Sequence, residues 1–201
     1  MKKKSLKILL CGILSTLLLT NCDRTYTYQN SVLFYENNFD FPIYSEQGYN
    51  TFGVMFDNQS LVSDNNVIPM KVLTKSNQIS FVFTGKHYIS KQNYNGSIKT
   101  LKFVINNLTI DKFEDLILME GLHFPLNDSN CQVIYDNEPL KIDNGLFHIK
   151  KVGKIILDGE NLCVYMSGEF YFDTYLDDFP TCFYEGRYDI TVGKHNFYKV
   201  P

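Results

Sequence analysis

Two segments near the C-terminal end of the chain alternate apolar and polar residues with the two-residue period of a β-strand. Segment 182–192 follows segment 162–172 after a short loop, as in an antiparallel hairpin with one buried face. Gly168 falls on the apolar side, where a missing side chain marks a bulge or a close backbone approach. The predicted apolar face holds Leu162, Val164, Met166, Phe170 and Phe172 from one strand and Cys182, Tyr188, Ile190 and Val192 from the other, and Glu185, Arg187 and Asp189 are expected to look outward.

The rest of the chain has the composition of a β-rich protein. It contains 16 Phe and 14 Tyr but no alanine, which is the best helix former, and it is rich in Asn, which favours turns. We therefore predict an all-β fold, either an antiparallel β-sandwich or a barrel-like domain. Further strands are predicted at 51–56, 79–85, 98–105, 131–136, 145–152 and 154–158, with 31–36 as a first strand or an extended linker. Turns are predicted at Asp57-Asn58, Asn95-Gly96, Asn144-Gly145 and Asp158-Gly159.

One stretch, 111–121 (DKFEDLILMEG), competes for a short helix. Asp111 and Glu114 have the spacing of a capping box, and Gly121 suits a helix C-terminus. A single helical turn or short helix and a loop running into a strand both fit this stretch.

The N-terminus has the pattern of an export signal. Residues 1–21 carry four lysines and no acid, and an unbroken apolar run covers 8–19. Twelve residues of helix span about 18 Å, short of the ~30 Å hydrocarbon core, so the pattern predicts a secretory signal helix and not a membrane span. The stretch that ends at Cys22 resembles the lipobox of bacterial lipoproteins, although Asn21 departs from the small residue usual before the cysteine.

The lipobox resemblance implies that Cys22 is lipidated and becomes the first mature residue, and a half-cystine of the fold is the alternative. We expect a signal peptide at 1–21, a tether or first extended segment at 22–48, and one β-rich domain at 49–201. The expected location is the cell envelope, with a lipid anchor in the membrane. The outer membrane is favoured, and the face that carries the domain is left open.

Charge argues against nucleic acid as a partner. Lys and Arg total 19 and Asp and Glu total 22, so removing the four signal lysines leaves 15 against 22, a net charge of −7. An acidic domain without a basic patch has no electrostatic footprint for a polyanion. The expected partners are the membrane, through the N-terminal lipid, and a protein or a glycan.

Two regions of the mature chain resemble small lipoproteins of Bacteroidota-type bacteria whose function is not established. Segment 48–63 (GYNTFGVMFDNQSLVS) is similar to their N-terminal signature, and 166–173 (MSGEFYFD) with 185–190 (EGRYDI) is similar to their C-terminal pattern. Val54 stands where the family often has cysteine, and Ser63 replaces a proline. The resemblance implies a β-fold and an envelope location, and it transfers no catalytic residue.

Three cysteines remain in the mature chain after Cys22, namely Cys131, Cys163 and Cys182. In an oxidising compartment this number predicts one disulfide and one leftover thiol, with the pairing left open. A Cys/His nucleophilic site is the sharper hypothesis, with His87, His123, His148 and His195 as the available bases.

The loop of the last hairpin gathers acids and aromatic residues. Its carboxylates suggest three readings: acid–base catalysis on a glycosidic bond, a calcium site, or ordinary solvated turn residues. Exposed tyrosines beside acids are also typical of protein and carbohydrate contact surfaces. The candidate binding surface is Tyr171, Asp173, Tyr175, Asp177, Asp178, Tyr184 and Glu185.

The sequence contains no phosphate-binding glycine loop, zinc-protease motif or nucleophile elbow. We therefore expect no catalytic residue, metal or cofactor. The leading hypothesis is a non-enzymatic exported lipoprotein that acts as an envelope binding or structural module. The alternatives are an envelope hydrolase that uses the acidic 173–185 turn and an inhibitor or immunity-type lipoprotein.

Overall fold

A computed structural model describes residues 41–64, 67–89, 96–126 and 129–201. The predicted signal peptide, Cys22 and the predicted strand at 31–36 lie outside the described residues, as does Asn95 of one predicted turn. The described residues form β1 (Thr51–Phe56), β2 (Gln59–Val62), β3 (Met70–Lys75), β4 (Gln78–Tyr88), β5 (Ser97–Asn106), η1 (Phe113–Met119), β6 (His123–Pro125), β7 (Cys131–Tyr135), β8 (Glu138–Leu140), β9 (Asn144–Leu157), β10 (Glu160–Leu176), β11 (Phe179–Val192) and β12 (Phe197–Lys199).

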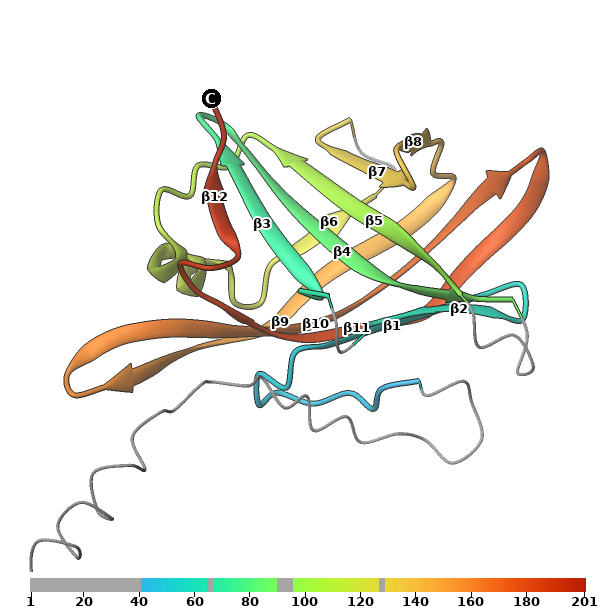
Figure 1. Ribbon diagram of the computed structural model, residues 1–201. Coiled ribbons are helices and arrows are strands. Elements are labelled where there is room, and N and C mark those ends of the chain that lie inside the picture. The colour runs from blue at the N-terminus through green and yellow to red at the C-terminus, as the bar shows by residue number, and fades with distance from the viewer. Residues whose placement is uncertain (1–40, 65–66, 90–95, 127–128) are drawn as a thin grey trace, which may run out of the picture.

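The strands belong to one sheet that curls into a half-barrel (Figure 1). Its order is β6-β9-β10-β11-β1-β2-β4-β5-β7-β8, and β3 pairs with the N-terminal half of β4. The pairings are antiparallel except between β12 and β3. The predicted all-β antiparallel class is therefore confirmed.

The core fills the concave side of the curled sheet. Phe83 of β4 stacks on Phe52 of β1 with ring centroids 4.7 Å apart, and Phe103 of β5 lies 4.6 Å from Phe147 of β9. Because β5 and β9 lie far apart in the sheet order, the Phe103–Phe147 contact holds the two halves of the curl together. The apolar face predicted for 162–172 supplies this core from Val164 to Phe172, whereas Leu162 is 53 % exposed.

Two-residue turns with positive φ close four of the hairpins. They are Asp57-Asn58, Asp136-Asn137, Asp158-Gly159 and Asp177-Asp178, and Asp and Asn tolerate this left-handed conformation. The turns predicted at 57–58 and 158–159 are confirmed. The turn predicted at Asn144-Gly145 is wrong, because Asn144 already pairs with Asp173 in β9.

Most predicted strands are present, with two kinds of difference. Segments 145–152 and 154–158 form the single strand β9, since Gly153 continues the ladder opposite Tyr165. The short strands β2, β3, β6, β8 and β12 were not predicted. The helix hypothesis for 111–121 is confirmed as a 3₁₀ helix, but its cap is one residue later than expected, because the backbone N–H of Lys112 donates to Asp115. Within the described ranges, no helical structure has the length and apolar character needed to cross a membrane.

A bulge in β11 changes which of its residues face the core. Phe170 pairs with Gly186 and Phe172 pairs with Phe183, so Tyr184 and Glu185 together lie opposite Tyr171. Glu185 takes a φ of 53°, and both bulge residues are exposed. The prediction that Cys182 shares the buried face with Tyr188 is therefore wrong, and Cys182 is exposed on the outer face.

The same geometry excludes one of the pairings that the disulfide prediction left open. Cys163 and Cys182 are free thiols. Cys182 pairs with Asp173, which lies ten residues from Cys163 along β10, or about 33 Å at 3.3 Å per residue. A disulfide needs Cα atoms within about 7 Å, so these two cysteines cannot be bridged.

Residues 41–49, here called the strap, cross the convex outer face of β11 and β1 (Figure 1). Asp189 of β11, expected to look outward, does lie on this face but is only 1 % exposed, because the strap covers it. Its carboxylate accepts hydrogen bonds from the Ser45 hydroxyl and from the backbone N–H groups of Gln47, Gly48 and Tyr49. The C-terminal part of the segment expected to be a tether or first extended segment is thus fixed to the domain.

Candidate functional site

An open groove of about 600 Å³ lies between the strap and the outer face of β9, β10 and β11. Its size is within the range of small-ligand sites. The strap forms one wall and the three strands form the floor and the other wall. The lining residues are Phe41 and Tyr44 from the strap, Leu146 and His148 from β9, Glu169, Phe170 and Tyr171 from β10, and Glu185, Gly186 and Arg187 from β11.

The strap approaches the sheet closely because β1 carries a glycine beneath it. A Cβ atom on Gly53 would lie 2.8 Å from Pro42 and 2.9 Å from Phe41, too close for a side chain. Phe41 is only 1 % exposed, and the guanidinium of Arg187 lies 4.5 Å from the centre of its ring. Phe41 therefore anchors the start of the strap at the edge of the groove.

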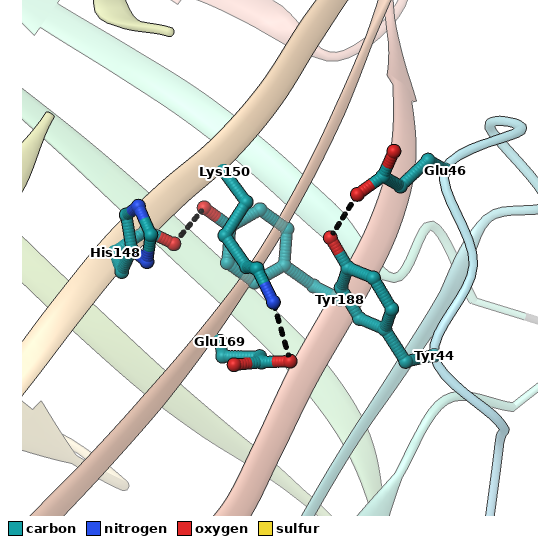
Figure 2. Close-up of polar contacts among 6 residues, drawn as sticks. All are labelled: Tyr44, Glu46, His148, Lys150, Glu169 and Tyr188. Carbon is teal, nitrogen blue, oxygen red and sulfur yellow. Dashed lines mark hydrogen bonds and ion pairs between the residues drawn. The ribbon is translucent and has the colours of Figure 1, made fainter. Parts of the chain in front are cut away.

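Tyr44 stands over the groove between two carboxylates and an amine (Figure 2). Its hydroxyl donates to Glu46 at 2.7 Å, and the Nζ atom of Lys150 lies 4.7 Å from the centre of its ring. Lys150 also pairs with Glu169 at 3.0 Å. Burial and the acceptor Glu46 raise the pKa of Tyr44, so the hydroxyl remains protonated and can donate.

The opposite side of the groove carries a second ion pair. Arg187 donates to Glu185 at 3.1 Å, and the β11 bulge brings Glu185 to this position. At the groove, the acids Glu169 and Glu185 pair with Lys150 and Arg187, and the Glu46 carboxylate beside Tyr44 adds one negative charge. The groove therefore has only a weak negative field.

His148 contributes an uncharged ring. Its imidazole stacks on that of His123 with centroids 3.9 Å apart. Burial, followed by the neighbouring His123, lowers the pKa of His148. At neutral pH the His148 ring thus offers one donor and one acceptor to the groove.

A buried tyrosine supports the groove floor from the core side. Tyr188 is 2 % exposed, and its hydroxyl donates to the His148 carbonyl at 3.3 Å across β10 (Figure 2). Gly168 makes room for this, because a Cβ there would collide with that carbonyl and with the Tyr188 hydroxyl. The close approach predicted at Gly168 is confirmed.

The predicted binding surface divides into three parts. Tyr171 and Glu185 line the groove. Tyr184, 38 % exposed, and Tyr175, 52 % exposed, continue from Tyr171 along the outer face of the β10–β11 hairpin, and Asp173 is half-buried between them. We call Tyr171, Tyr184 and Tyr175 the tyrosine strip.

The last part, Asp177 and Asp178, forms the turn at the end of the hairpin with φ values of 50° and 68°. Both are exposed. The structure places these acids outside the groove lining, and among the described residues no group of three or more His, Cys, Asp or Glu side chains could hold a metal ion.

Within the described part of the chain, Cys163 and His195 lie near each other, as the cysteine–histidine hypothesis requires. A Cβ atom on Gly193 would lie 3.4 Å from both the Cβ of Cys163 and the Nδ1 of His195. Burial raises the pKa of Cys163 and lowers the pKa of His195, which favours a neutral thiol beside a neutral ring. Cys182 is exposed, but burial of its sulfur and the Asp173 carboxylate raise its pKa to about 11. Neither environment activates a thiolate.

Sequence reasoning missed most of the groove. The strap residues Phe41 and Tyr44 belong to a segment without periodicity, so no pattern pointed to them. Arg187 was expected to look outward, and neither it nor Glu169 was connected to a site. A usable signal was the acid at Asp189 in an otherwise apolar strand end, since a buried carboxylate requires a covering segment that supplies donors.

No protein-family model matches the chain, and no curated protein or solved structure shows significant similarity to it. The resemblance to small lipoproteins of Bacteroidota-type bacteria therefore stays a prediction.

Proposed function

We propose that this chain is an exported, non-enzymatic lipoprotein of the cell envelope, anchored through Cys22 in the outer membrane, whose β-domain binds a glycan chain. The observation that carries the binding proposal is the groove together with the tyrosine strip that extends it along one face of a rigid hairpin. The anchor rests on the sequence at 1–22.

The chemistry of this surface suits sugars. A pyranose ring has apolar C–H faces and a rim of hydroxyl groups, so it needs flat aromatic contacts beside hydrogen-bond partners. Tyr171 and Tyr184 supply exposed rings, and Glu169, Glu185 and Arg187 supply acceptors and donors. A rigid sheet holds these groups, which reduces the ordering cost of binding.

Charge balance narrows the ligand class. The ion pairs Lys150–Glu169 and Arg187–Glu185 leave the Glu46 carboxylate as the one further charge beside the groove, and His148 is neutral at pH 7. The surface therefore suits a neutral glycan better than an anionic polymer. Its open, elongated form favours an internal segment of a chain over a single buried sugar.

The binding proposal is tested by glycan-array screening of the purified protein, followed by calorimetry with the best neutral oligosaccharide. Tyr171→Ala is expected to weaken binding about tenfold, which corresponds to about 1.4 kcal/mol for one lost stacking contact. Tyr198→Ala is the matched control, because Tyr198 is 39 % exposed on β12 and lies outside the groove lining and the tyrosine strip. Absence of glycan binding, or equal affinity of Tyr171→Ala and wild type, would refute the proposal, and capture of a protein at this surface would replace it.

The anchor is tested separately by mass spectrometry of the mature N-terminus and by protease treatment of intact cells. An acylated peptide beginning at Cys22 is the expected result. Loss of the domain to external protease would place it on the cell surface, and protection would place it on the inner side. An unmodified Cys22 would refute the anchor and leave the binding proposal standing.

A further inference from the structure

The β9–β10 hairpin extends beyond the rest of the sheet (Figure 1). Its end carries exposed apolar side chains. Ile156, Leu157 and Leu162 are 63 %, 52 % and 53 % exposed, and Ile155 is 36 % exposed. These side chains cover both faces of a two-stranded ribbon. A contiguous exposed apolar group of this kind marks a contact surface.

The free edge of β9 is the second feature of this hairpin. Strand β6 pairs only with 146–148, and the N–H groups of Ile149 and Val152 donate to the Leu122 carbonyl and to Glu120. By strand alternation from Val152, the N–H and C=O groups of Lys154 and Ile156 also point away from β10. Among the described residues, no strand pairs with this edge beyond 148.

We infer that this edge pairs antiparallel with the same edge of a second copy of the chain, centred on Ile155. In this register Lys154 of one copy and Ile156 of the other form hydrogen-bonded pairs on both sides of the two-fold axis, with four backbone hydrogen bonds in total. The paired stretch is 153–157, which lies between the Val152 N–H already used by Glu120 and the Asp158 turn.

Charge favours the same register. Segment 150–160 (KKVGKIILDGE) is basic at its start and acidic at its end. An antiparallel pair centred on Ile155 runs the basic start of one copy alongside the acidic end of the other, beyond both ends of the paired stretch. A register centred on Lys154 would instead set that lysine against its own copy, which is unfavourable.

The hairpin end is less suited to lipid. Asp158 and Glu160 are exposed at the tip, where a membrane-inserting hairpin would have to bury them first. Pairing with another strand instead satisfies the backbone hydrogen bonds of the edge and buries its apolar side chains in one step. An open strand edge is a template for such pairing.

Cysteine cross-linking of the full chain in intact cells tests the register. The two Ile155 residues form a non-hydrogen-bonded pair with Cα atoms about 4.5 Å apart, within the range of a disulfide. Ile155→Cys is expected to give at least tenfold more covalent dimer under mild oxidation than Ile98→Cys, which makes the same change at an exposed position of β5. The native cysteines contribute equally to both variants. Equal yields would overturn the inference.

Charge substitutions at Ile156 test the contact without a cross-linker. Ile156→Lys sets a lysine opposite Lys154 of the other copy and is expected to raise the dimer dissociation constant at least tenfold, measured by sedimentation of the full chain in detergent. Ile156→Glu has the opposite charge at the same site and is expected to retain the dimer, and Lys154→Glu combined with Ile156→Lys is expected to restore it. Circular dichroism confirms that each variant is folded.

Two sedimentation outcomes also overturn this inference. One is a wild-type chain that stays monomeric up to the highest concentration reached. The other is equal weakening by Ile156→Lys and Ile156→Glu, which would show an apolar contact without strand register. Binding of the wild-type chain to phospholipid vesicles is measured in parallel. If Ile156→Lys and Ile156→Glu both lose this binding equally, the hairpin contacts lipid and not a second copy.

Discussion

The carboxylate of Asp189 is expected to determine whether the strap stays on the sheet. It lies under the strap, 1 % exposed, and accepts from the Ser45 hydroxyl and from three backbone N–H groups. Asp189→Asn keeps the size of the side chain but removes the charge, and it turns one acceptor oxygen into a donor.

The magnitude follows from these bonds. Hydrogen bonds to a charged group contribute about 1.5–3 kcal/mol each, against about 0.5–1.5 kcal/mol for neutral ones. An amide oxygen in the Oδ2 position keeps three bonds as neutral ones, and its NH₂ group then faces the Gly48 N–H, which donated to Oδ1 at 2.7 Å. The lower desolvation cost of an uncharged group offsets part of this loss. The expected net change in the free energy of unfolding is about 3 kcal/mol.

Thermal and denaturant unfolding measure the global effect. For a domain of this size, about 3 kcal/mol corresponds to a fall in Tm of roughly 6–12 °C. Hydrogen exchange measures the local effect, and the amides of Gln47, Gly48 and Tyr49 are expected to lose protection first. Asp173→Asn is the control, since Asp173 is half-buried on the outer face of the neighbouring strand. An unchanged Tm together with unchanged protection of these three amides would refute the role given to Asp189.

Three further predictions follow from the core, a histidine and a thiol. Gly168→Ala is expected to lower the free energy of unfolding, measured in urea, by about 3 kcal/mol or more, because its methyl group collides with the His148 carbonyl and the Tyr188 hydroxyl. Gly121→Ala is the milder comparison, since its methyl group meets no atom within 4 Å and only the φ of 78° is strained. Burial and Lys99 lower the pKa of His87, and Asp136 opposes them. Protonation of His87 therefore favours the unfolded state, so Tm is expected to fall as the pH drops below about 6.5. His87→Gln should reduce the slope of Tm against pH between about pH 7 and 5, before the carboxylates titrate. Maleimide is expected to label Cys182 slowly at pH 7.5 and faster as the pH rises toward the pKa of this thiol, about 11. Asp173→Asn should increase the labelling rate at fixed pH. An unchanged rate would exclude Asp173 as a cause of the raised pKa.

The sequence predicted the parts of the fold that repeat along the chain. Period-two alternation located β10 and β11, and aromatic and β-branched runs located β1, β4, β5 and β7. The short strands β2, β6, β8 and β12 were missed because three or four residues contain too few repeats, and β12 pairs only with β3 among the described residues.

The bulge at Tyr184 and Glu185 shows a second limit. Residues after the bulge keep the predicted faces, as Tyr188, Ile190 and Val192 are buried. Residues before it, including Cys182, take the opposite face. A single added residue reverses the parity of a strand, and a non-glycine residue at positive φ gives no sequence signal.

The groove shows a third limit, because its two walls have different origins. Tyr171 and Glu185 were predicted as surface residues from the hairpin alone, whereas Phe41 and Tyr44 reach the groove through a segment held by backbone donors on Asp189. Backbone N–H groups are the same in almost every residue type, so the residues that donate them leave no recognisable sequence pattern in the strap.

This division separates two ways of weakening the proposed glycan site. Tyr171→Ala removes one contact from the strand wall and is expected to lower affinity without lowering Tm, since the ring is 46 % exposed. Asp189→Asn substitutes no groove-lining residue but releases the strap that carries Phe41 and Tyr44. Affinity for the glycan and protection of the strap amides from hydrogen exchange should therefore fall together. A ligand that binds the groove should in turn slow hydrogen exchange at Gly48 and Tyr49, because binding and strap docking are linked. Binding without such protection would place the ligand on the tyrosine strip alone.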